Sequence, residues 1–438
     1  MRRSLLAAVA ASVTVGLSAP AAFAAPEPSD QSVVVGGTLE AMNKERTIGA
    51  TLEAVRVYRT WSNTTPSGLP SLTESTEASK LASYMGAGKR TLMYSAGVPW
   101  HSWMAEAKRL NGDGDPTNNV ADPYCKWKPK VATKSWFKSY ADGDYDAELR
   151  TWLRQFNDLA ASVPEIYLSI LPEADRLDAS PAAAKYQRCV GTAADVRAAW
   201  QRMVNIAGGR VVGGASLNAM DRTGGKIRWV PVMTDWAFTH TSGATSPERE
   251  LVNFRTGLPP ANATGADATL TSSRATPWMP PVGTYDYAGI DVFNFSGAIA
   301  GITVPTRIKV DDPATAVLEE DRWRSLDVIT RAVLLWARHN APMPDGQAAP
   351  IYIAELGSVP DPTRPGRRAA WLDEGCRFVA QEPRIRAVLY FDANTMRLNT
   401  WNWKKRSDGG WDATAPATGV DTVSAQALGR WLTGCATG

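Results

Sequence analysis

Two glutamates each close an apolar stretch of the sequence, and their positions predict chemistry. Glu173 ends the stretch that begins at Glu165, and Glu355 ends the stretch that begins at Pro350. Apolar stretches of this length are typical of buried parallel strands, and a carboxylate at the carboxyl end of such a strand is typical of a catalytic residue in a barrel. Two such acids could hydrolyse a glycosidic bond, since one protonates the leaving oxygen and the other attacks the anomeric carbon.

The expected roles follow from the geometry of that reaction. Cleavage with retention requires the two carboxyl groups to lie about 5–5.5 Å apart, which opposite sides of one barrel mouth can supply. We expect Glu355 to be the nucleophile and Glu173 the acid that later becomes the base, with a pKa raised by partial burial beside Glu355. In the alternative interpretation each glutamate pairs with an arginine and only stabilises the mouth. Arg59 is the expected partner of Glu355 in both cases.

Eight apolar segments that could position these residues predict a closed α/β barrel. Several amphipathic helices lie between them, which indicates βα units and a parallel sheet. No Gly-x-Gly-x-x-Gly follows any strand, so a (β/α)8 TIM barrel with long loops on the catalytic face is favoured over a doubly wound dinucleotide-binding sheet. The expected strands are Ser32–Val35, Val55–Tyr58, Thr91–Tyr94, Ile166–Leu171, Ile227–Met233, Gly289–Phe293, Ile351–Ala354 and Ile385–Tyr390, and the expected helices are Tyr145–Ala160, Thr192–Ala207, Trp323–Arg338, Arg367–Gln381 and Val423–Leu432.

Strand alternation predicts where the two acids point. In strand four, Ser169 and Leu171 share one face with Glu173. In strand seven, Ile351 and Ile353 share one face with Glu355. We therefore expect both acids to point inward together with these neighbours.

An ordered series of short motifs resembles the retaining glycoside hydrolases of clan A. Trp200 within Ala-Ala-Trp-Gln-Arg, Gly289-Ile-Asp-Val-Phe and Ile353-Ala-Glu-Leu-Gly are most similar to the β-mannanase-type family, family twenty-six, over about residues 50–435. The resemblance implies double displacement on a β-linked polysaccharide, with mannan as the first substrate. Pro172 stands where that family has histidine, and Phe293 where it has tyrosine. These two departures motivate an alternative function, a catalytically inactive barrel that binds glycan.

Aromatic residues supply candidates for substrate binding. The chain has 17 tryptophans, and those in strand-to-helix loops could stack on sugar faces, although such rings also cover neighbouring loops. Asn294 could equally form a turn and Asp392 could equally cap a helix. Six tryptophans on helix stripes are expected in the core: Trp152, Trp200, Trp323, Trp336, Trp371 and Trp431. The candidates for substrate binding are Arg59, Trp61, Trp100, Trp236, Asn294, Asp392 and Trp401.

The first residues of the chain predict an exported protein. A positively charged start, an apolar stretch and Ala22-Phe-Ala24 are typical of a signal peptide over residues 1–24, which leaves residues 25–438 as a single catalytic domain. Charged residues make up 21% and the net charge is +3, which favours an uncharged polysaccharide or oligosaccharide over nucleic acid or a membrane surface. We expect a secreted monomer that needs no cofactor.

The cysteines predict disulfide bonds, and one run of polar residues raises the question of a bound metal ion. Four cysteines in an exported chain favour two disulfides, and of three possible connectivities chain order suggests Cys125 with Cys189 and Cys376 with Cys435. Residues 111–122 space oxygen atoms as a calcium loop does, but Pro116 replaces the required glycine, so a polar turn is preferred and no metal is expected.

Overall fold

Most of the residues that form the expected barrel are described by a computed structural model. Its described residues are 33–60, 69, 90–97, 129–131, 133–160, 163–179, 181–184, 186–208, 227–294, 323–343, 346–358, 366–392, 403–405, 411–413 and 421–434. Among the candidates for substrate binding, Trp61, Trp100 and Trp401 lie outside these residues, as does the run 111–122.

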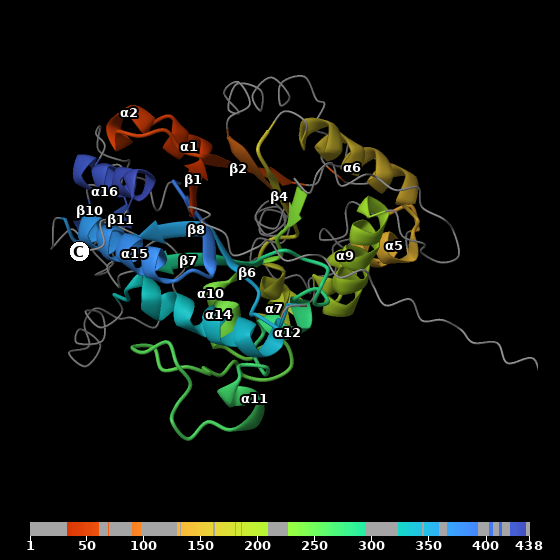
Figure 1. Cartoon of the computed structure of the whole chain (residues 1–438). Coiled ribbons are helices and arrows are strands. Elements are labelled where there is room, and N and C mark those ends of the chain that lie inside the picture. Colours follow the sequence, from red (N-terminus) through yellow and green to blue (C-terminus); the bar gives the residue numbers. More distant parts are fainter. Residues whose placement is uncertain are drawn as a thin grey trace, which may run out of the picture.

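The centre of the fold is one sheet of parallel strands (Figure 1). Its strand order is β5-β4-β3-β2-β1-β9-β8-β7-β6, and every neighbouring pair is parallel. The strands are β1 Val34–Thr38, β2 Ala54–Thr60, β3 Thr91–Gly97, β4 Ile166–Ile170, β5 Ile227–Trp229, β6 Val232–Thr234, β7 Ala288–Asn294, β8 Ile351–Ser358 and β9 Ile385–Tyr390. A separate antiparallel pair joins β10 Trp403–Lys405 to β11 Trp411–Ala413.

The sheet closes on itself because its two end strands are successive pieces of one extended segment. Only Val230 and Pro231 separate β5 from β6, and Pro231 has no amide proton to donate to a ladder. On one side the Val230 amide donates to Leu168 O at 3.0 Å, and on the other the Gly289 amide donates to Pro231 O at 2.8 Å. The segment 227–234 is therefore the fifth of eight barrel strands, and the predicted (β/α)8 barrel is confirmed.

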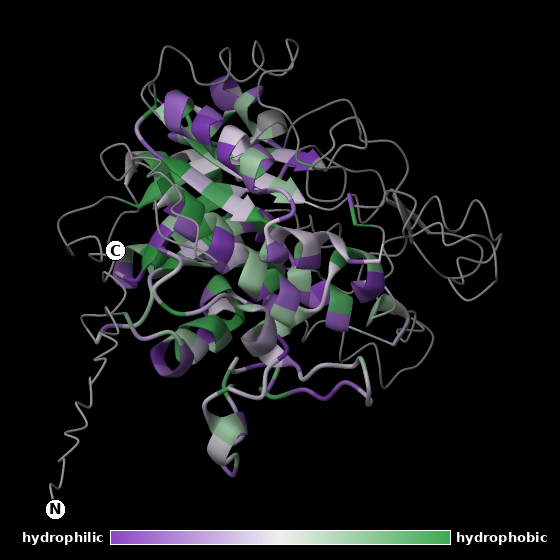
Figure 2. Cartoon of the chain, turned by 90° about the vertical axis from the view of Figure 1, so that its right-hand side faces the viewer, coloured by the Kyte–Doolittle hydropathy of each residue, from purple (hydrophilic) through white to green (hydrophobic). Residues whose placement is uncertain are grey.

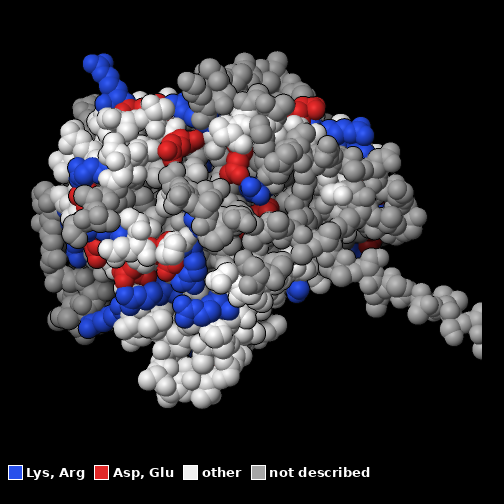
Figure 3. Space-filling model, in the orientation of Figure 1, with Lys and Arg blue, Asp and Glu red and all other residues white. Residues whose placement is uncertain are grey.

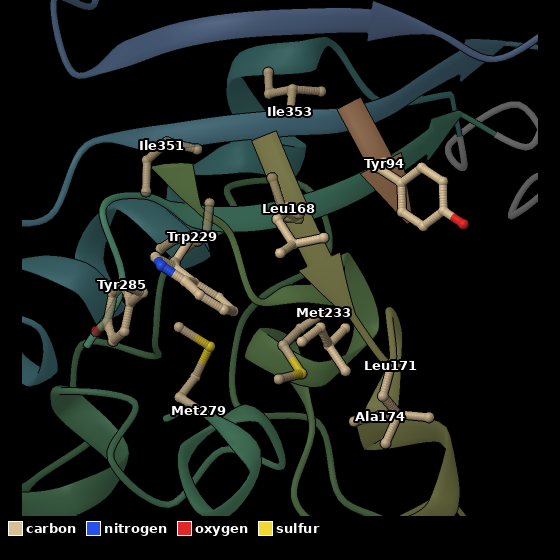
Figure 4. Packing of buried hydrophobic residues seen from close by; sticks show 14 of the residues in the cluster. Tyr94, Leu168, Leu171, Ala174, Trp229, Met233, Met279, Tyr285, Ile351 and Ile353 are labelled. Atoms are coloured by element: carbon tan, nitrogen blue, oxygen red, sulfur yellow. The ribbon is translucent and has the colours of Figure 1, made fainter. Parts of the chain in front are cut away.

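Side chains of alternate residues fill the barrel or face the helices. The residues inside, here called the inner cluster, are Ala54, Met93, Tyr167, Val230, Val232, Tyr287, Tyr352, Ala354, Ala387 and Leu389. Three of them form an aromatic layer, with ring centroids 4.6 Å apart for Tyr167 and Tyr352 and 5.6 Å for Tyr167 and Tyr287. The larger set between sheet and helices, the outer cluster, includes Leu168, Trp229, Ile351 and Ile353 (Figure 4).

The helices surround the sheet and carry apolar and polar faces (Figure 2). α9 begins with a capping box in which Thr192 and Asp195 satisfy each other's backbone amides. The longer helices are α5 Trp136–Asp142, α6 Asp146–Ala160, α9 Ala193–Ala207, α14 Leu326–Asn340, α15 Arg367–Gln381 and α16 Thr422–Thr433. Short helices are α1 Leu39–Met42, α2 Glu45–Ile48, η2 Ala174–Asp178, α7 Pro181–Ala184, α8 Gln187–Val190, α10 Asp235–Thr239, α11 Gly265–Ala268 and α12 Ala275–Trp278.

Several expected boundaries differ from the structure, among them those of the first strand and of the helix expected from Trp323. The first strand is shifted towards Thr38, because Val34 to Gly37 pair with Ala387 to Tyr390 of β9. The helix expected from Trp323 begins at Leu326, since Ser325 adopts extended backbone as its N-cap. Trp323 therefore lies before α14, where the Arg367 guanidinium is 4.1 Å from its ring centroid. The other five tryptophans expected in the core are buried.

Two further findings concern the cysteines and the helices of the described residues. No cysteine among the described residues is free. Cys125 and Cys435 lie outside those residues, so the two disulfide pairings stay predictions. Within the described ranges, none of the helices has the length and apolar character that a membrane span requires.

Candidate active site

A β-bulge in β8 turns Glu355 towards the inside of the barrel. Ile353 pairs with Ile290 of β7, and Glu355 pairs with the next residue, Asp291, so β8 contains one extra residue at Ala354. The pairing with β9 shifts over the same residues. As a bulge places two successive side chains on one face, Ala354 and Glu355 can both point inward.

The bulge corrects the expected alternation in strand seven. Ile351 and Ile353 belong to the outer cluster, so they face the helices and do not share a face with Glu355. In strand four, Ser169 lies on the inner side with Tyr167, but the strand ends at Ile170 and Leu171 joins the outer cluster. Simple alternation therefore fails to place either acid. Glu173 follows the end of β4, whereas Glu355 lies inside β8, which continues past the expected end at Ala354 to Ser358.

Two residues of β2 hold Glu355. The Tyr58 hydroxyl donates to Glu355 Oε1 at 2.7 Å, and Arg56 Nη1 lies 3.1 Å from the same oxygen. Arg56 also donates to Asp291 Oδ1 at 3.0 Å and to Ala354 O at 2.6 Å. The expectation that Arg59 pairs with Glu355 is wrong. Arg59 has the opposite parity from Arg56 and Tyr58, and its guanidinium donates to Tyr58 O at 3.0 Å.

Burial and neighbouring charges shift the pKa values of this group. Burial raises the pKa of Glu355 to about 7; Arg56 opposes this shift, and the charge of Glu173 adds to it. Burial and the charge of Glu355 also raise the pKa of Asp291 well above its usual range, against the effect of Arg56. The two acids on β7 and β8 thus compete for the positive charge of one guanidinium.

Glu173 follows a turn with unusual backbone. Leu171 has φ 53° and Glu173 has φ 58°, a left-handed conformation that costs a non-glycine residue about 1–2 kcal/mol. The turn is held because the Glu173 amide donates to Val232 O at 2.7 Å and the Leu171 amide donates to Ala96 O at 2.7 Å. Arg176 Nη2 in turn donates to Glu173 Oε1 at 2.7 Å. Strained backbone of this kind is often found at functional sites.

A buried network anchors the short helix η2 behind Glu173. Asp175 is fully buried and accepts from both the amide and the hydroxyl of Thr234, at 3.0 and 2.7 Å. Arg274 lies 3.6 Å from Asp175 and also pairs with Glu248. The turn that carries Glu173 is therefore tied to the end of β6.

The candidate binding residues Asn294 and Asp392 are buried, and both make polar contacts with other residues of the protein. Asn294 accepts from the Arg324 amide at 3.1 Å, and Arg324 pairs at 3.2 Å with Asp235, the first residue of α10. Asp392 is 0% exposed, pairs with Lys44, and its amide donates to the Thr38 hydroxyl. Asn294 is the last residue of β7 and Asp392 follows β9, so these contacts hold the carboxyl ends of the two strands in place at the barrel mouth.

Trp236 is the tryptophan of the described part that stands at the mouth and remains exposed. It follows β6 within α10, and 41% of its surface is exposed. Its ring stacks on His240 with centroids 3.8 Å apart and planes at 10°, while its indole N–H donates to Glu248 at 2.9 Å. One face is thus supported and the N–H is already occupied. Burial lowers the pKa of His240 to about 4, so this support is neutral near pH 7.

The sequence prediction missed several charged residues that gather around the two glutamates. Arg56, Tyr58 and Asp291 lie within apolar strands. Arg176 is the third residue of η2 after β4, and Asp235 is the first residue of α10 after β6. A charged side chain in the middle of an apolar strand was the available signal, because such residues are rarely buried without a partner.

One face of the described part of the chain is mixed in charge. On the face in Figure 3, acidic and basic side chains lie next to one another. Within the described ranges, no group of three or more histidine, cysteine, aspartate and glutamate side chains is arranged to hold a metal ion.

The comparisons with known proteins concern the fold. No protein-family model matches the chain, and no curated protein is similar to it in sequence. Among solved structures, GH26C from Muricauda sp. MAR_2010_75 is similar with 10% identity and a TM-score of 0.44, over 93% of this chain and 86% of that one. A GH5_18 from Bifidobacterium longum subsp. infantis has 11% identity and a TM-score of 0.47, over 92% and 79%. An endo-1,4-beta-D-mannanase from Thermotoga petrophila RKU-1 has 8% identity and a TM-score of 0.41, over 92% and 99%.

These structures include glycoside hydrolases of the kind that the sequence motifs resemble. For this chain, the closed ring of strands itself defines the class of protein: a (β/α)8 barrel whose mouth holds paired carboxyl groups.

Proposed function

We propose that the chain is a secreted retaining glycoside hydrolase that cleaves a β-linked polysaccharide. The observation that carries the proposal is the pair of strand-end glutamates, Glu173 after β4 and Glu355 on β8, close enough for the charge of one to shift the pKa of the other. Export is part of the proposal and is supported by the signal-peptide pattern of residues 1–24.

The proposed mechanism assigns one role to each acid. Glu355 attacks the anomeric carbon, and Glu173 first protonates the leaving oxygen and then removes a proton from the incoming water. A nucleophile must be ionised, and Arg56 favours the ionised form of Glu355 against the effect of burial. The exposed face of Trp236 supports a sugar-stacking role, because its other face is fixed by His240.

Release of reducing sugar from a panel of β-mannan, β-xylan and mixed-linkage β-glucan tests the proposal. We expect at least one of these to be cleaved, with mannan the first to test because of the sequence resemblance. No release from any β-glycan in the panel would contradict the proposal.

Matched variants test the two roles. Glu355→Ala should abolish the glycosyl-enzyme intermediate, and added azide should restore turnover with inverted product, because a small anion can occupy the vacated face. Glu173→Ala should spare the first step for aryl glycosides with a good leaving group, which need no protonation. Identical responses of the two variants to azide and leaving group would show that the roles are wrongly assigned.

A second candidate function is glycan binding without hydrolysis. The observation that favours it is the ion pair of Glu173 with Arg176, because the guanidinium already occupies one carboxylate oxygen of the expected proton donor. Pro172 before Glu173 points the same way. Isothermal titration of the wild type with oligosaccharides separates the candidates: binding with no turnover favours this function.

The variant Arg176→Met distinguishes hydrolysis from glycan binding without hydrolysis. If the ion pair suppresses hydrolysis, removal of the guanidinium should increase the release of sugar. If the protein is a hydrolase in which Arg176 only orients Glu173, the same variant should lower it.

A further inference from the structure

The carboxyl group of Glu355 is held asymmetrically. Both the Tyr58 hydroxyl, at 2.7 Å, and Arg56 Nη1, at 3.1 Å, contact Oε1. No hydrogen bond to Oε2 is made by the residues that the structure describes, and Glu355 keeps 8% of its surface exposed. The two oxygens therefore differ in their environment before any ligand binds.

Tyr58 itself is fixed in place although it is 37% exposed. The Arg56 guanidinium lies 4.5 Å from the centroid of its ring. The Phe391 ring meets it edge to face with centroids 6.1 Å apart, and Phe293 of β7 meets Phe391 at 5.6 Å. Phe293 lies on the strand beside β8 but has no hydroxyl to offer, so the phenol that contacts Glu355 comes from the other side of the barrel, on β2.

We propose that Tyr58 is a positioning residue that, together with Arg56, fixes Oε1 of Glu355 and leaves Oε2 as the oxygen that attacks the anomeric carbon. The proposal rests on the proposed function. In the first step the Oε2–carbon bond forms as the glycosidic C–O bond breaks, and the leaving oxygen takes the bonding electrons and the proton of Glu173. In the second step water adds to the same carbon, its proton passes to Glu173, and the electrons of the Oε2–carbon bond return to the Glu355 carboxylate.

This arrangement stabilises the carboxylate more than the ester. In the ester, Oε1 is a neutral carbonyl oxygen, and hydrogen bonds to charged acceptors are roughly twice as strong as those to neutral ones. Tyr58 therefore favours release of Glu355 in the second step. Other charged groups also act on Glu355, and a test must hold them constant: Arg56 on β2, Asp291 on β7, and Glu173 and Arg176 after β4.

Tyr58→Phe removes the hydroxyl and keeps the ring against Arg56 and Phe391. The matched control is Tyr352→Phe, because Tyr352 is fully buried in the inner cluster and its hydroxyl has no partner among the described residues. With an activated aryl glycoside, Tyr58→Phe should lower kcat about tenfold to hundredfold, from the loss of one hydrogen bond to a charged group. The glycosyl-enzyme should accumulate in mass spectra, and the acidic limb of kcat/KM should move to higher pH. Tyr352→Phe should change none of these, and similar behaviour of the two variants would overturn the proposal.

A second measurement does not depend on turnover. Titration of the Glu355 carboxyl by ¹³C NMR, assigned with Glu355→Gln, should give a higher pKa in Tyr58→Phe than in the wild type, because a hydrogen bond that favours the ionised form is lost. An unchanged pKa would overturn the role of Tyr58 even if the wild type cleaves no substrate. If the wild type is active, Glu355→Ala is inactive and Tyr58→Phe is normal, the proposed function stands and this inference fails.

Discussion

The environment of Glu355 shifts its pKa and also lowers the free energy of unfolding at high pH. Its carboxyl group is buried, so its charged form is disfavoured, and its partner Arg56 is shared with Asp291. A group of this kind is typical of functional sites, where pKa values are often perturbed.

The first prediction at this scale concerns activity and pH. A nucleophile must be ionised, so the acidic limb of kcat/KM should have an apparent pKa near 7, the value to which burial raises the pKa of Glu355. The value belongs to the interacting pair of Glu355 and Asp291. Initial rates on the best substrate of the panel from pH 4 to 9 check it. An acidic limb near pH 4 would contradict it.

The second prediction concerns stability and pH. The folded protein binds the Glu355 proton more tightly than the unfolded chain, so this stabilisation is complete below pH 4.5 and is lost as pH rises through about 7. Relative to Glu355→Gln, the wild type should lose on the order of 3 kcal/mol of unfolding free energy between these limits. Urea unfolding of both proteins at pH 4.5, 6 and 8 measures it.

Glu382 provides a control of opposite sign. Hydrogen bonds and charge from Arg384 hold the pKa of Glu382 below its usual range despite partial burial. Its stabilisation is therefore present above the unfolded pKa and is lost as pH falls. Relative to Glu382→Gln, the wild type should lose stability towards acid, not towards base. Parallel curves for wild type and Glu355→Gln would show that Glu355 has an ordinary pKa.

At the scale of elements, the ends of β4 and β8 are where regular structure is broken to place the acids. β8 inserts Ala354 as a bulge, and β4 stops at Ile170 before a turn with two left-handed residues. Each irregularity directs a carboxyl group to the mouth. Regular strands would direct the side chain of residue 355 towards the helices.

The turn after β4 gives a prediction about strain. Glu173 adopts φ 58°, where glycine is tolerated and alanine is not. Glu173→Gly should be about 1 kcal/mol more stable than Glu173→Ala, although both lose the contact with Arg176. Chemical unfolding of the two variants at one pH measures the difference. Equal stability would show that the turn carries no strain at this residue.

For the molecule as a whole, closure of the barrel depends on the seam, which is the segment 227–234 together with the strands β4 and β7 that pair with its two halves. Gly289 of β7 lies against this seam, and a Cβ atom there would be 2.7 Å from Pro231 O. Since backbone cannot yield easily, Gly289→Ala should destabilise the protein by about 1–3 kcal/mol.

Gly97→Ala is the matched control for the seam. Among the described residues, a Cβ atom at Gly97 would meet Pro172 alone, at 3.6 Å, which is an ordinary contact. Thermal unfolding should therefore show a lower midpoint for Gly289→Ala than for Gly97→Ala. Equal midpoints would mean that the seam is not closed as described.

The disulfides also belong to this scale. α15 and α16 pack together, with the Trp431 N–H donating to Leu372 O at 2.9 Å and Arg430 pairing with Asp373. This packing supports the predicted bridge between Cys376 of α15 and Cys435, which follows α16. Peptide mapping without reduction should recover Cys376 with Cys435 and Cys125 with Cys189. A peptide that joins Cys125 to Cys376 would contradict both pairings.

The number, order and type of the barrel strands could be predicted from local sequence patterns. Alternation of apolar segments with amphipathic helices is a local property, and the capping box at Thr192 and the bounds Arg367–Gln381 of α15 follow from residues a few positions apart. The position of Glu173 just after a strand was predictable for the same reason, whereas the expected strand end at Ala354 was wrong because β8 continues past Glu355 to Ser358.

The directions of the strand side chains and the contacts between residues far apart in the sequence depend on the tertiary structure. Arg56 pairs with Glu355 across the barrel because closure of the sheet places side chains of β2 and β8 in the same interior. The bulge at Ala354 is defined by the pairing of β8 with its two neighbouring strands. The same holds for Tyr58, whose hydroxyl lies beside a carboxylate almost three hundred residues later in the chain. Contacts of this kind depend on register and ring closure, which no local pattern in the sequence specifies.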